Sequence, residues 1–351
     1  MQNLPNTACA GPRKEHAGQA ADAERHVRRL AQRLLPPQGS VARLDSIQTL
    51  CWIASRRSAG QEVPPLPVLP LGGVKSLHFN NGEILIMAEN PLVWHYGLMA
   101  ERWAEFINEA REVPYFLSKI EQYGQPVLDL GCGTGRVLLP LLGKGVDIDG
   151  CDFSDDMLKF CRQKAKQAGF NPNLYQSSMH AFDIPRKYKL IYICDSFGLS
   201  GSRDNDLETL KRCHSHLEDG GALVVNVQAD YSDPDWWSMW LSENRKLLPT
   251  PYPEKGHGRI ASDGSEHFGQ FRLIAFDPLN QSYVREVRLE KWVEGKLDRF
   301  EEYTLRGNIY FKHELLLMLK VAGFHDITIC GDYKEEMATA DHEEIVFTAL
   351  K

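Results

Sequence analysis

The chain has 351 residues, of which 43% are hydrophobic and 25% charged, a composition typical of globular proteins and a length sufficient for one large domain or two smaller ones. A net charge of -7 argues against a nucleic-acid-binding protein, and no apolar run approaches the roughly 18 residues that a membrane helix needs. The eight cysteines lack a metal-binding spacing and the first residues lack the apolar core of a secretory signal. We therefore expect a cytoplasmic protein with reduced thiols, no structural metal, and neither a membrane nor a nucleic acid as partner.

Residues 1–75 differ in composition from the rest of the chain. They carry ten Lys and Arg against five Asp and Glu, and they end in the proline-rich stretch VPPLPVLPLGG. Such a segment is either a loosely docked extension that closes with a stiff linker, or an arm for docking or oligomerisation, so a homodimer stays open. We place the boundary at residue 75 and expect 76–351 to form the main domain.

The main domain begins with helical patterns and continues as an alternation of strands and helices. Residues 91–124 predict two helices before the first strand. Helical patterns then follow at about 135, at 154–169 and at 204–221, between strands predicted at 126–130, 146–153, 173–178, 189–198 and 222–230. This spacing predicts right-handed crossovers and a mostly parallel sheet covered on both faces.

The pattern changes after the fifth strand. Three period-two segments at 268–276, 282–293 and 296–307 predict an antiparallel meander, followed by a helix at 312–324 and closing strands at 325–333 and 343–351. We therefore expect an α/β fold with a doubly wound, mostly parallel, seven-stranded sheet. The meander would be a lid inserted at about 231–310, at the sheet edge where ligands bind in such folds.

A glycine-rich turn, VLDLGCGTG (127–135), follows the first strand. Gly131, Gly133 and Gly135 allow the backbone to approach a ligand without an intervening side chain. Arg136 stands where a dinucleotide-binding turn would need glycine, and the Gly-Lys-Ser/Thr of a phosphate-binding loop is absent. The turn therefore suits neither a dinucleotide nor a bare phosphate.

Three side chains near the turn favour a cationic nucleoside. Asp152 ends the second strand, where an acid can accept hydrogen bonds from both ribose hydroxyls. Phe153 and Met157 offer apolar surface for an adenine. Asp129 would repel a diphosphate, whereas it suits a ligand that carries an ammonium or a sulfonium.

On these motifs the stretch 85–351 resembles the Rossmann-like S-adenosylmethionine-dependent methyltransferases, in the branch with an antiparallel lid that includes sugar-amine and glycine N-methyltransferases. The loop SSMHAFDIP resembles their adenine loop, although Ser178 replaces an acid that many members place there. The resemblance implies S-adenosylmethionine as the cofactor. Its expected binding residues are Asp129, Gly131, Cys132, Gly133, Gly135, Asp152, Phe153, Met157, Ser178, Met179 and Asp195.

Four side chains are candidates for contact with the methyl acceptor. Asp195 follows the fourth strand, where the methyl group would emerge, and Tyr96 lies in a region that closes over the cofactor in the resembling family. Arg306 and Tyr310 lie where the lid returns to the sheet. An aromatic cluster at 236–240 could hold a cation or an apolar body, or form a small core under the lid.

We therefore expect a methyltransferase that acts on a small-molecule metabolite, on nitrogen. The alternatives are carbon or oxygen methylation of a natural product, prenyl-type acceptors included, and a non-catalytic cofactor-binding or interaction protein. The sequence shows no basic cluster for a diphosphate, which disfavours a prenyl diphosphate acceptor.

Overall fold

The computed structural model describes residues 74–80, 83–88 and 92–351. The chain divides into two compact units, residues 1–90 and 91–351. In the first unit, β1 (Val74–Asn80) and β2 (Glu83–Ala88) pair antiparallel. Residues 1–73 of the predicted amino-terminal extension lie outside the described residues, so its role stays a prediction.

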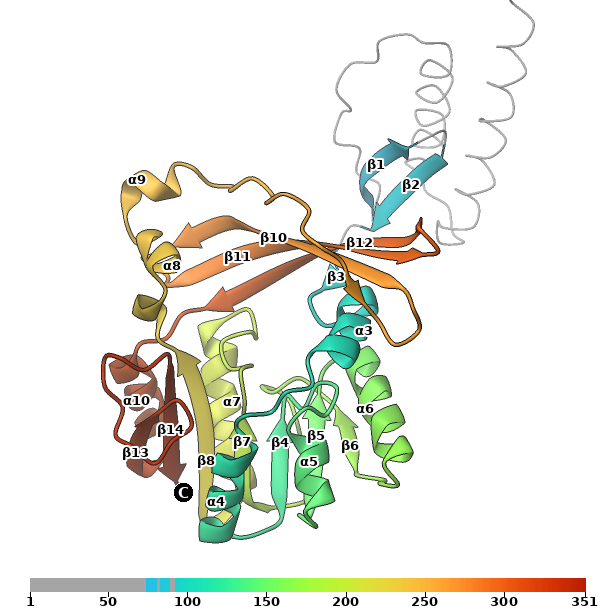
Figure 1. Cartoon of the computed structure of the whole chain (residues 1–351). Helices are drawn as coiled ribbons and strands as arrows, with labels where there is room; N and C mark the ends of the chain where they lie inside the picture. Colours follow the sequence, from blue (N-terminus) through green and yellow to red (C-terminus); the bar gives the residue numbers. More distant parts are fainter. Residues whose placement is uncertain (1–73, 81–82, 89–91) are drawn as a thin grey trace, which may run out of the picture. The chain divides into compact units, whose positions relative to one another are not determined.

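Within residues 92–351, seven strands form the main sheet in the order β13-β14-β8-β7-β4-β5-β6 (Figure 1). The strands are β4 (Val127–Leu130), β5 (Ile148–Asp152), β6 (Leu174–Gln176), β7 (Tyr188–Ile193), β8 (Leu217–Gln228), β13 (His325–Gly331) and β14 (Glu344–Leu350). Strands β6, β5, β4, β7 and β8 are parallel, and β14 and β13 complete the sheet antiparallel. The predicted doubly wound sheet is confirmed.

Two hydrophobic clusters cover the two faces of this sheet. Successive residues of β7 alternate between them: Leu190 belongs to one cluster and Ile191 to the other. Helices α4 (Val113–Tyr123), α5 (Leu138–Gly143) and α6 (Asp155–Gln167) contribute to one cluster, and α7 (Arg203–His216) and α10 (Lys312–Val321) to the other. This period-two alternation is why the strands are apolar on both sides.

Helix α7 ends earlier than its sequence pattern suggested. The helical pattern was predicted to run to Gly221, but the helix ends at His216 and β8 begins at Leu217. Leu217 is extended and buried, and it pairs with Tyr188 before the register shifts and Ala222 pairs with Leu190. Burial of Leu217 against the sheet outweighs the helical pattern, and the shift in register accommodates the residues between.

The lid is an antiparallel sheet with one short parallel strand. Its strand order is β3-β12-β11-β10-β9, with β3 (Leu92–Val93), β9 (Arg259–Ile260), β10 (Glu266–Asp277), β11 (Ser282–Val293) and β12 (Lys296–Asn308). The connection from β8 contains η1 (Asp230–Ser232), α8 (Pro234–Ser238) and α9 (Ser242–Arg245). Figure 1 shows the lid beyond the carboxyl ends of the parallel strands.

Helix α3 (Gly97–Phe106) ties the lid to the sheet domain. Its first backbone N–H groups lack intrahelical partners, and carboxylates from both sides accept from them. Gly97 N donates to Asp156 Oδ2 of α6 at 2.7 Å, and Leu98 N donates to Glu301 Oε2 of β12 at 2.6 Å. The same helix end therefore fixes the lid above the sheet. In the described parts of the chain, no helix has the length and apolarity of a membrane span.

Candidate active site

A first cavity of about 290 Å³ opens at the carboxyl ends of β4 and β5. It brings together the residues expected to bind a cofactor, with the exception of Gly135. Those lining the cavity are Asp129, Gly131, Cys132, Gly133, Asp152, Phe153, Met157, Ser178, Met179 and Asp195. These residues come from four separate stretches of the sequence, 129–133, 152–157, 178–179 and 195, and meet at one place.

The glycines of the turn differ in what they do. All three have positive φ: 91° at Gly131, 52° at Gly133 and 86° at Gly135. A Cβ on Gly133 would meet open space, so its backbone is bare toward the cavity. A Cβ on Gly131 would lie 2.5 Å from Ser196 Oγ, and one on Gly135 would lie 2.9 Å from Cys161 Sγ. Gly135 thus allows close packing behind the turn and does not reach the cavity.

Asp152 is held in place by backbone amides. Its Oδ2 accepts from Gly133 N at 2.9 Å, and its Oδ1 accepts from Ser154 N at 2.9 Å. Burial raises the pKa of this carboxyl, and the backbone amides oppose that shift. Each oxygen keeps a second lone pair. The carboxylate can therefore accept two more hydrogen bonds from a ribose while it anchors the glycine turn.

Tyr96 lies behind the wall of the first cavity. Its hydroxyl donates to Phe153 O at 3.3 Å, and its ring packs edge-on against Phe153 with centroids 5.7 Å apart. Its neighbour His95 lines the cavity instead. Burial lowers the pKa of His95 to about 4, so this imidazole is neutral at pH 7. Its Nδ1 is buried and has no hydrogen-bond partner among the described residues.

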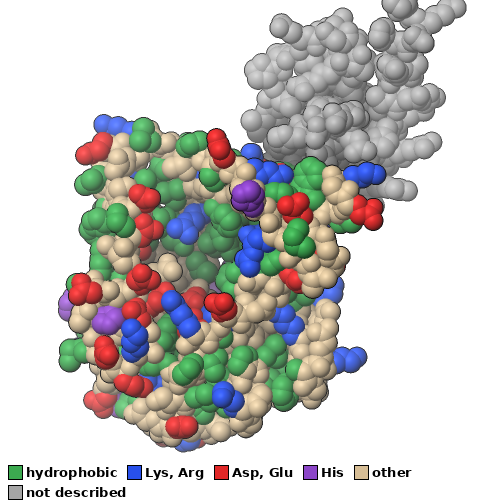
Figure 2. Space-filling model, in the orientation of Figure 1, with side chains coloured by type: hydrophobic (Ala, Val, Ile, Leu, Met, Phe, Trp, Pro, Cys, Tyr) green, Lys and Arg blue, Asp and Glu red, His purple; other side chains and the backbone are tan. Residues whose placement is uncertain are grey.

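A second cavity, of about 730 Å³, lies between the sheet and the lid. It shares four residues with the first cavity, and Figure 2 shows this face hollowed below the lid, with charged side chains around the opening. The shared residues are His95, Trp103, Asp195 and Leu199. A group passed from a ligand in one cavity to a ligand in the other would cross at these residues.

Asp195 is fixed at this junction in a left-handed conformation, with φ of 56°. Its backbone N donates to Asn226 Oδ1 at 2.9 Å, and its Oδ1 accepts from Asn226 Nδ2 at 2.8 Å. Its Oδ2 pairs with Arg136 at 2.9 Å. The strained backbone is thus held by a reciprocal pair of hydrogen bonds and by an ion pair.

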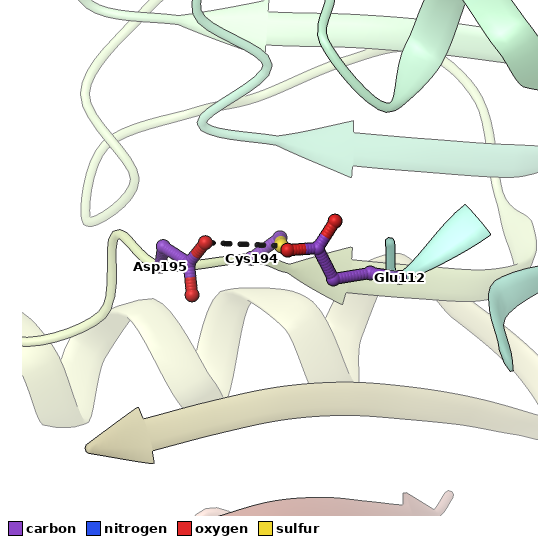
Figure 3. Close-up of side chains that lie close together, drawn as sticks. All are labelled: Glu112, Cys194 and Asp195. Atoms are coloured by element: carbon purple, nitrogen blue, oxygen red, sulfur yellow. Dashed lines mark hydrogen bonds between the residues drawn. The ribbon is translucent and has the colours of Figure 1, made fainter. Parts of the chain in front are cut away.

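Arg136 also pairs with the buried Glu112, at 2.7 Å. Figure 3 shows Glu112 and Asp195 on either side of Cys194, and ligand atoms of these three residues lie within 4.8 Å of one another. That spacing is compatible with a metal ion, but the guanidinium of Arg136 already pairs with both carboxylates. The arrangement is therefore a buried ion-pair network whose cation is an arginine.

The other two acceptor candidates lie apart from each other. Tyr310 is buried and lines the second cavity, and its hydroxyl donates to Asp206 Oδ2 at 2.7 Å. Arg306 is exposed and lines a separate cavity together with Arg203 and Tyr283. The structure therefore brings Tyr310, but not Arg306, to the cavity that contains Asp195.

Two polar residues of the second cavity have no counterpart in the sequence reasoning. Asn226 is on β8 and Glu344 is on the antiparallel strand β14, where it pairs with Gln228. Asn226 Nδ2 donates to Glu344 Oε2 at 2.7 Å. The sequence signal that could have identified them is a polar residue inside an otherwise apolar strand, as in VVNVQ and EIVF.

Comparison with known proteins agrees with this geometry. Residues 127–221 match the family described as a methyltransferase domain. The putative methyltransferase YqeM of Bacillus subtilis (strain 168) is 25% identical over 226 residues, which cover 64% of this chain and 83% of the relative. A demethylmenaquinone methyltransferase of Listeria monocytogenes serotype 4b (strain CLIP80459) is 28% identical over 176 residues, 47% of this chain and 73% of the relative.

Solved structures share the fold at low sequence identity. An S-adenosylmethionine-dependent methyltransferase from Clostridium acetobutylicum ATCC 824 superposes with a TM-score of 0.56 at 17% identity, over 72% of this chain and 97% of that one. The sugar N-methyltransferase KedS8 from Streptoalloteichus sp ATCC 53650 gives a TM-score of 0.55 at 18% identity, over 78% and 99%.

The fold and the first cavity together are those of an α/β methyltransferase. The methyl donor of such an enzyme contains a nucleoside, which the first cavity can hold. Residues 127–221 match a methyltransferase domain, and the chain has the Rossmann-like fold of S-adenosylmethionine-dependent methyltransferases. The protein is a methyltransferase whose cofactor is S-adenosylmethionine. The first cavity fits this group: Asp152 has free lone pairs for the ribose, Gly133 has bare backbone, and Asp129 offers a carboxylate to a cation.

S-Adenosylmethionine is expected to bind more tightly as the pH rises through 7. Burial raises the pKa of Asp129 to about 7, although Arg136 acts in the opposite direction. A cationic ligand favours the ionised carboxylate, so binding below pH 7 must release a proton. We expect the dissociation constant to fall about tenfold between pH 6 and 8.

Calorimetry across this range, in buffers of different ionisation enthalpy, measures both the affinity and the released proton. The Asp129→Asn variant isolates the contribution of Asp129 to the pH dependence of the affinity. This control is needed because burial also raises the pKa of Asp152. Its affinity should vary less with pH than that of the natural protein. An affinity of the natural protein that stays constant from pH 6 to 8 would contradict the assignment of Asp129.

Proposed function

We propose that the protein methylates a nitrogen atom of a small-molecule amine that binds in the second cavity. The observation that carries the proposal is the junction at Asp195, where an acidic, aromatic cavity under the lid meets the cofactor cavity. An amine held there would lie beside the methyl donor.

The charges of the second cavity favour a cation. Five acids line it, against the two arginines Arg111 and Arg285. The acids are Asp195, Asp230, Asp233, Glu343 and Glu344, and the aromatic residues are Trp94, Trp103, Phe197, Trp236, Tyr283 and Tyr310. Carboxylates pair with an ammonium group, and aromatic faces attract it further, so a protonated amine is favoured over an anionic acceptor.

Size and enclosure favour a small molecule. A volume of about 730 Å³ falls in the range of pockets for metabolites and drug-sized ligands. The lid covers the site from the side opposite the sheet, whereas a protein or nucleic-acid substrate would need an open groove. The sugar N-methyltransferase among the structures of similar fold supports an amine acceptor.

The chain contributes alignment and exclusion of water more than acid–base chemistry. When bound, S-adenosylmethionine supplies a methyl group that is already strongly electrophilic. Asp152 and the turn at Gly133 would fix the nucleoside, and Asp129 the cationic end. The lid and Trp103 would shield the junction from water. Holding the two reactants in line accounts for much of the rate enhancement expected of such a site.

A panel of acceptors tests this function. Amino sugars, arylethylamines and amino acids are incubated with methyl-labelled S-adenosylmethionine, alongside phenols, quinols and prenyl diphosphates. We expect transfer to amines, with the methylated atom identified by mass spectrometry and NMR. In the Asp195→Asn variant, turnover should fall while binding of S-adenosylhomocysteine is largely kept. Methylation confined to oxygen or carbon would overturn the nitrogen assignment.

A further inference from the structure

Glu344 has the position and environment of a proton acceptor in the second cavity. It is 6% exposed, lies on β14 beside the carboxyl end of β8, and lines the cavity next to Asp195. Asn226 Nδ2 donates to Glu344 Oε2 at 2.7 Å and to Asp195 Oδ1 at 2.8 Å. One amide nitrogen therefore separates the two carboxylates.

The surroundings of the two carboxylates differ. Asp195 is paired with Arg136, which stabilises its charged form. Glu344 has no ion pair within 4.0 Å among the described residues, and burial and the charge of Asp195 raise its pKa to about 7. The two carboxylates are therefore suited to different roles. Asp195, held by Arg136 and Asn226, is placed to fix a ligand, and Glu344 suits a group that gains a proton near neutral pH.

Two other titratable groups of the cavity are less suited. His95 borders both cavities, but a pKa lowered by burial to about 4 makes it a weak base. Burial raises the pKa of Tyr310, and its hydroxyl donates a hydrogen bond to Asp206. The charges that act on Glu344 from neighbouring elements are those of Asp195 and Arg111, and Tyr333 lies close enough to be affected by Glu344. Asp332 accepts a hydrogen bond from the backbone N–H of Glu344, and Asp230 and Glu343 line the same cavity.

We propose that Glu344 is a catalytic base, which takes the proton that the acceptor ammonium loses before methyl transfer. The N–H bond breaks, its electron pair stays on nitrogen, and the proton passes to a carboxylate oxygen of Glu344. The nitrogen lone pair then forms the N–C bond while the electron pair of the C–S bond stays on sulfur. This inference rests on the proposed function, since it requires an acceptor that must be deprotonated.

The first test is the pH dependence of kcat/KM with the amine of the panel that turns over fastest. In the natural protein kcat/KM should rise through pH 7 and level off. In Glu344→Gln it should be about 100-fold lower or more at pH 7.5. The kcat/KM of this variant should recover as the pH approaches the pKa of the free amine, because the variant depends on acceptor molecules that are already neutral. Glu344→Asp should keep part of the activity.

Glu336→Gln is the matched control, since Glu336 is exposed on the segment between β13 and β14 and lies outside both cavities. It should behave as the natural protein. Glutamine keeps an oxygen for Asn226, so Glu344→Gln should fold, and its circular dichroism and cofactor affinity check this. An unchanged rate and pH profile in Glu344→Gln would overturn the proposal.

A second measurement needs no acceptor. In protein labelled with 13C at the glutamate carboxyl carbon and saturated with S-adenosylhomocysteine, one resonance should titrate near pH 7 and be missing from Glu344→Gln. A Glu344 carboxyl that titrates near 4.3, the value of an ordinary glutamate, would overturn the proposal. This outcome is independent of which atom is methylated, so the proposed function and the role of Glu344 fail separately.

Discussion

Replacement of Asp152 by alanine is expected to weaken the binding of S-adenosylmethionine by at least about a hundredfold. The variant would lose the two charge-assisted hydrogen bonds that we expect Asp152 to accept from the ribose, each worth about 1.5–3 kcal/mol. It also leaves the amides of Gly133 and Ser154 without their carboxylate partner, so the glycine turn loses its tie to β5. Calorimetry with S-adenosylmethionine and with S-adenosylhomocysteine measures the loss, which should be similar for both.

Asp155→Ala provides the matched control. Asp155 is exposed in the first turn of α6, three residues from Asp152, and does not line either cavity. Its removal should change the affinity little. An equal loss in both variants would indicate a general electrostatic effect, and an unchanged affinity in Asp152→Ala would show that this carboxylate does not hold the ribose.

The cofactor cavity could be predicted from the sequence because its signals are local. The glycine turn directly follows an apolar run, and Asp152 ends the next one, so strand order alone brings them to one edge. Met157 follows from the helix that begins after Ser154. In the parallel part of the sheet, β4 and β5 are neighbours, as this reasoning requires.

The second cavity could be predicted only in outline. The meander has a clear period of two, so the lid was predictable. Which side chains point under it depends on how the lid packs on the sheet and on α3. His95 lines both cavities while the neighbouring Tyr96 packs behind Phe153, a difference of one position that no pattern encodes.

Glu344 and Asn226 illustrate a further limit. They are 118 residues apart and meet because β14 pairs antiparallel with β8. A polar residue in a strand predicts some partner, but the partner itself depends on register, which sequence periodicity does not fix across a long insertion.

Arg136 is another residue whose role could not be predicted from the sequence. In the sequence it indicated only that the glycine of a dinucleotide-binding turn is absent. Its side chain is 15% exposed and bridges Glu112, of which 5% is exposed, and Asp195. Arginine is the residue best suited to such a bridge, because its planar fork can donate to two carboxylates at once.

The Arg136→Leu variant is therefore expected to have the largest effect on stability, lowering the free energy of unfolding by about 3–5 kcal/mol, because the buried Glu112 would lose its closest counterion and keep only the exposed Arg111, at 3.9 Å. Urea unfolding followed by tryptophan fluorescence measures the change.

Lys189→Leu is the control, since the Lys189–Glu218 pair is partly exposed and its loss should cost at most about 1 kcal/mol. Adding Glu112→Gln to Arg136→Leu should restore part of the stability, because it removes the stranded charge. A loss in Arg136→Leu no larger than in Lys189→Leu would mean that this network contributes no more than a surface ion pair.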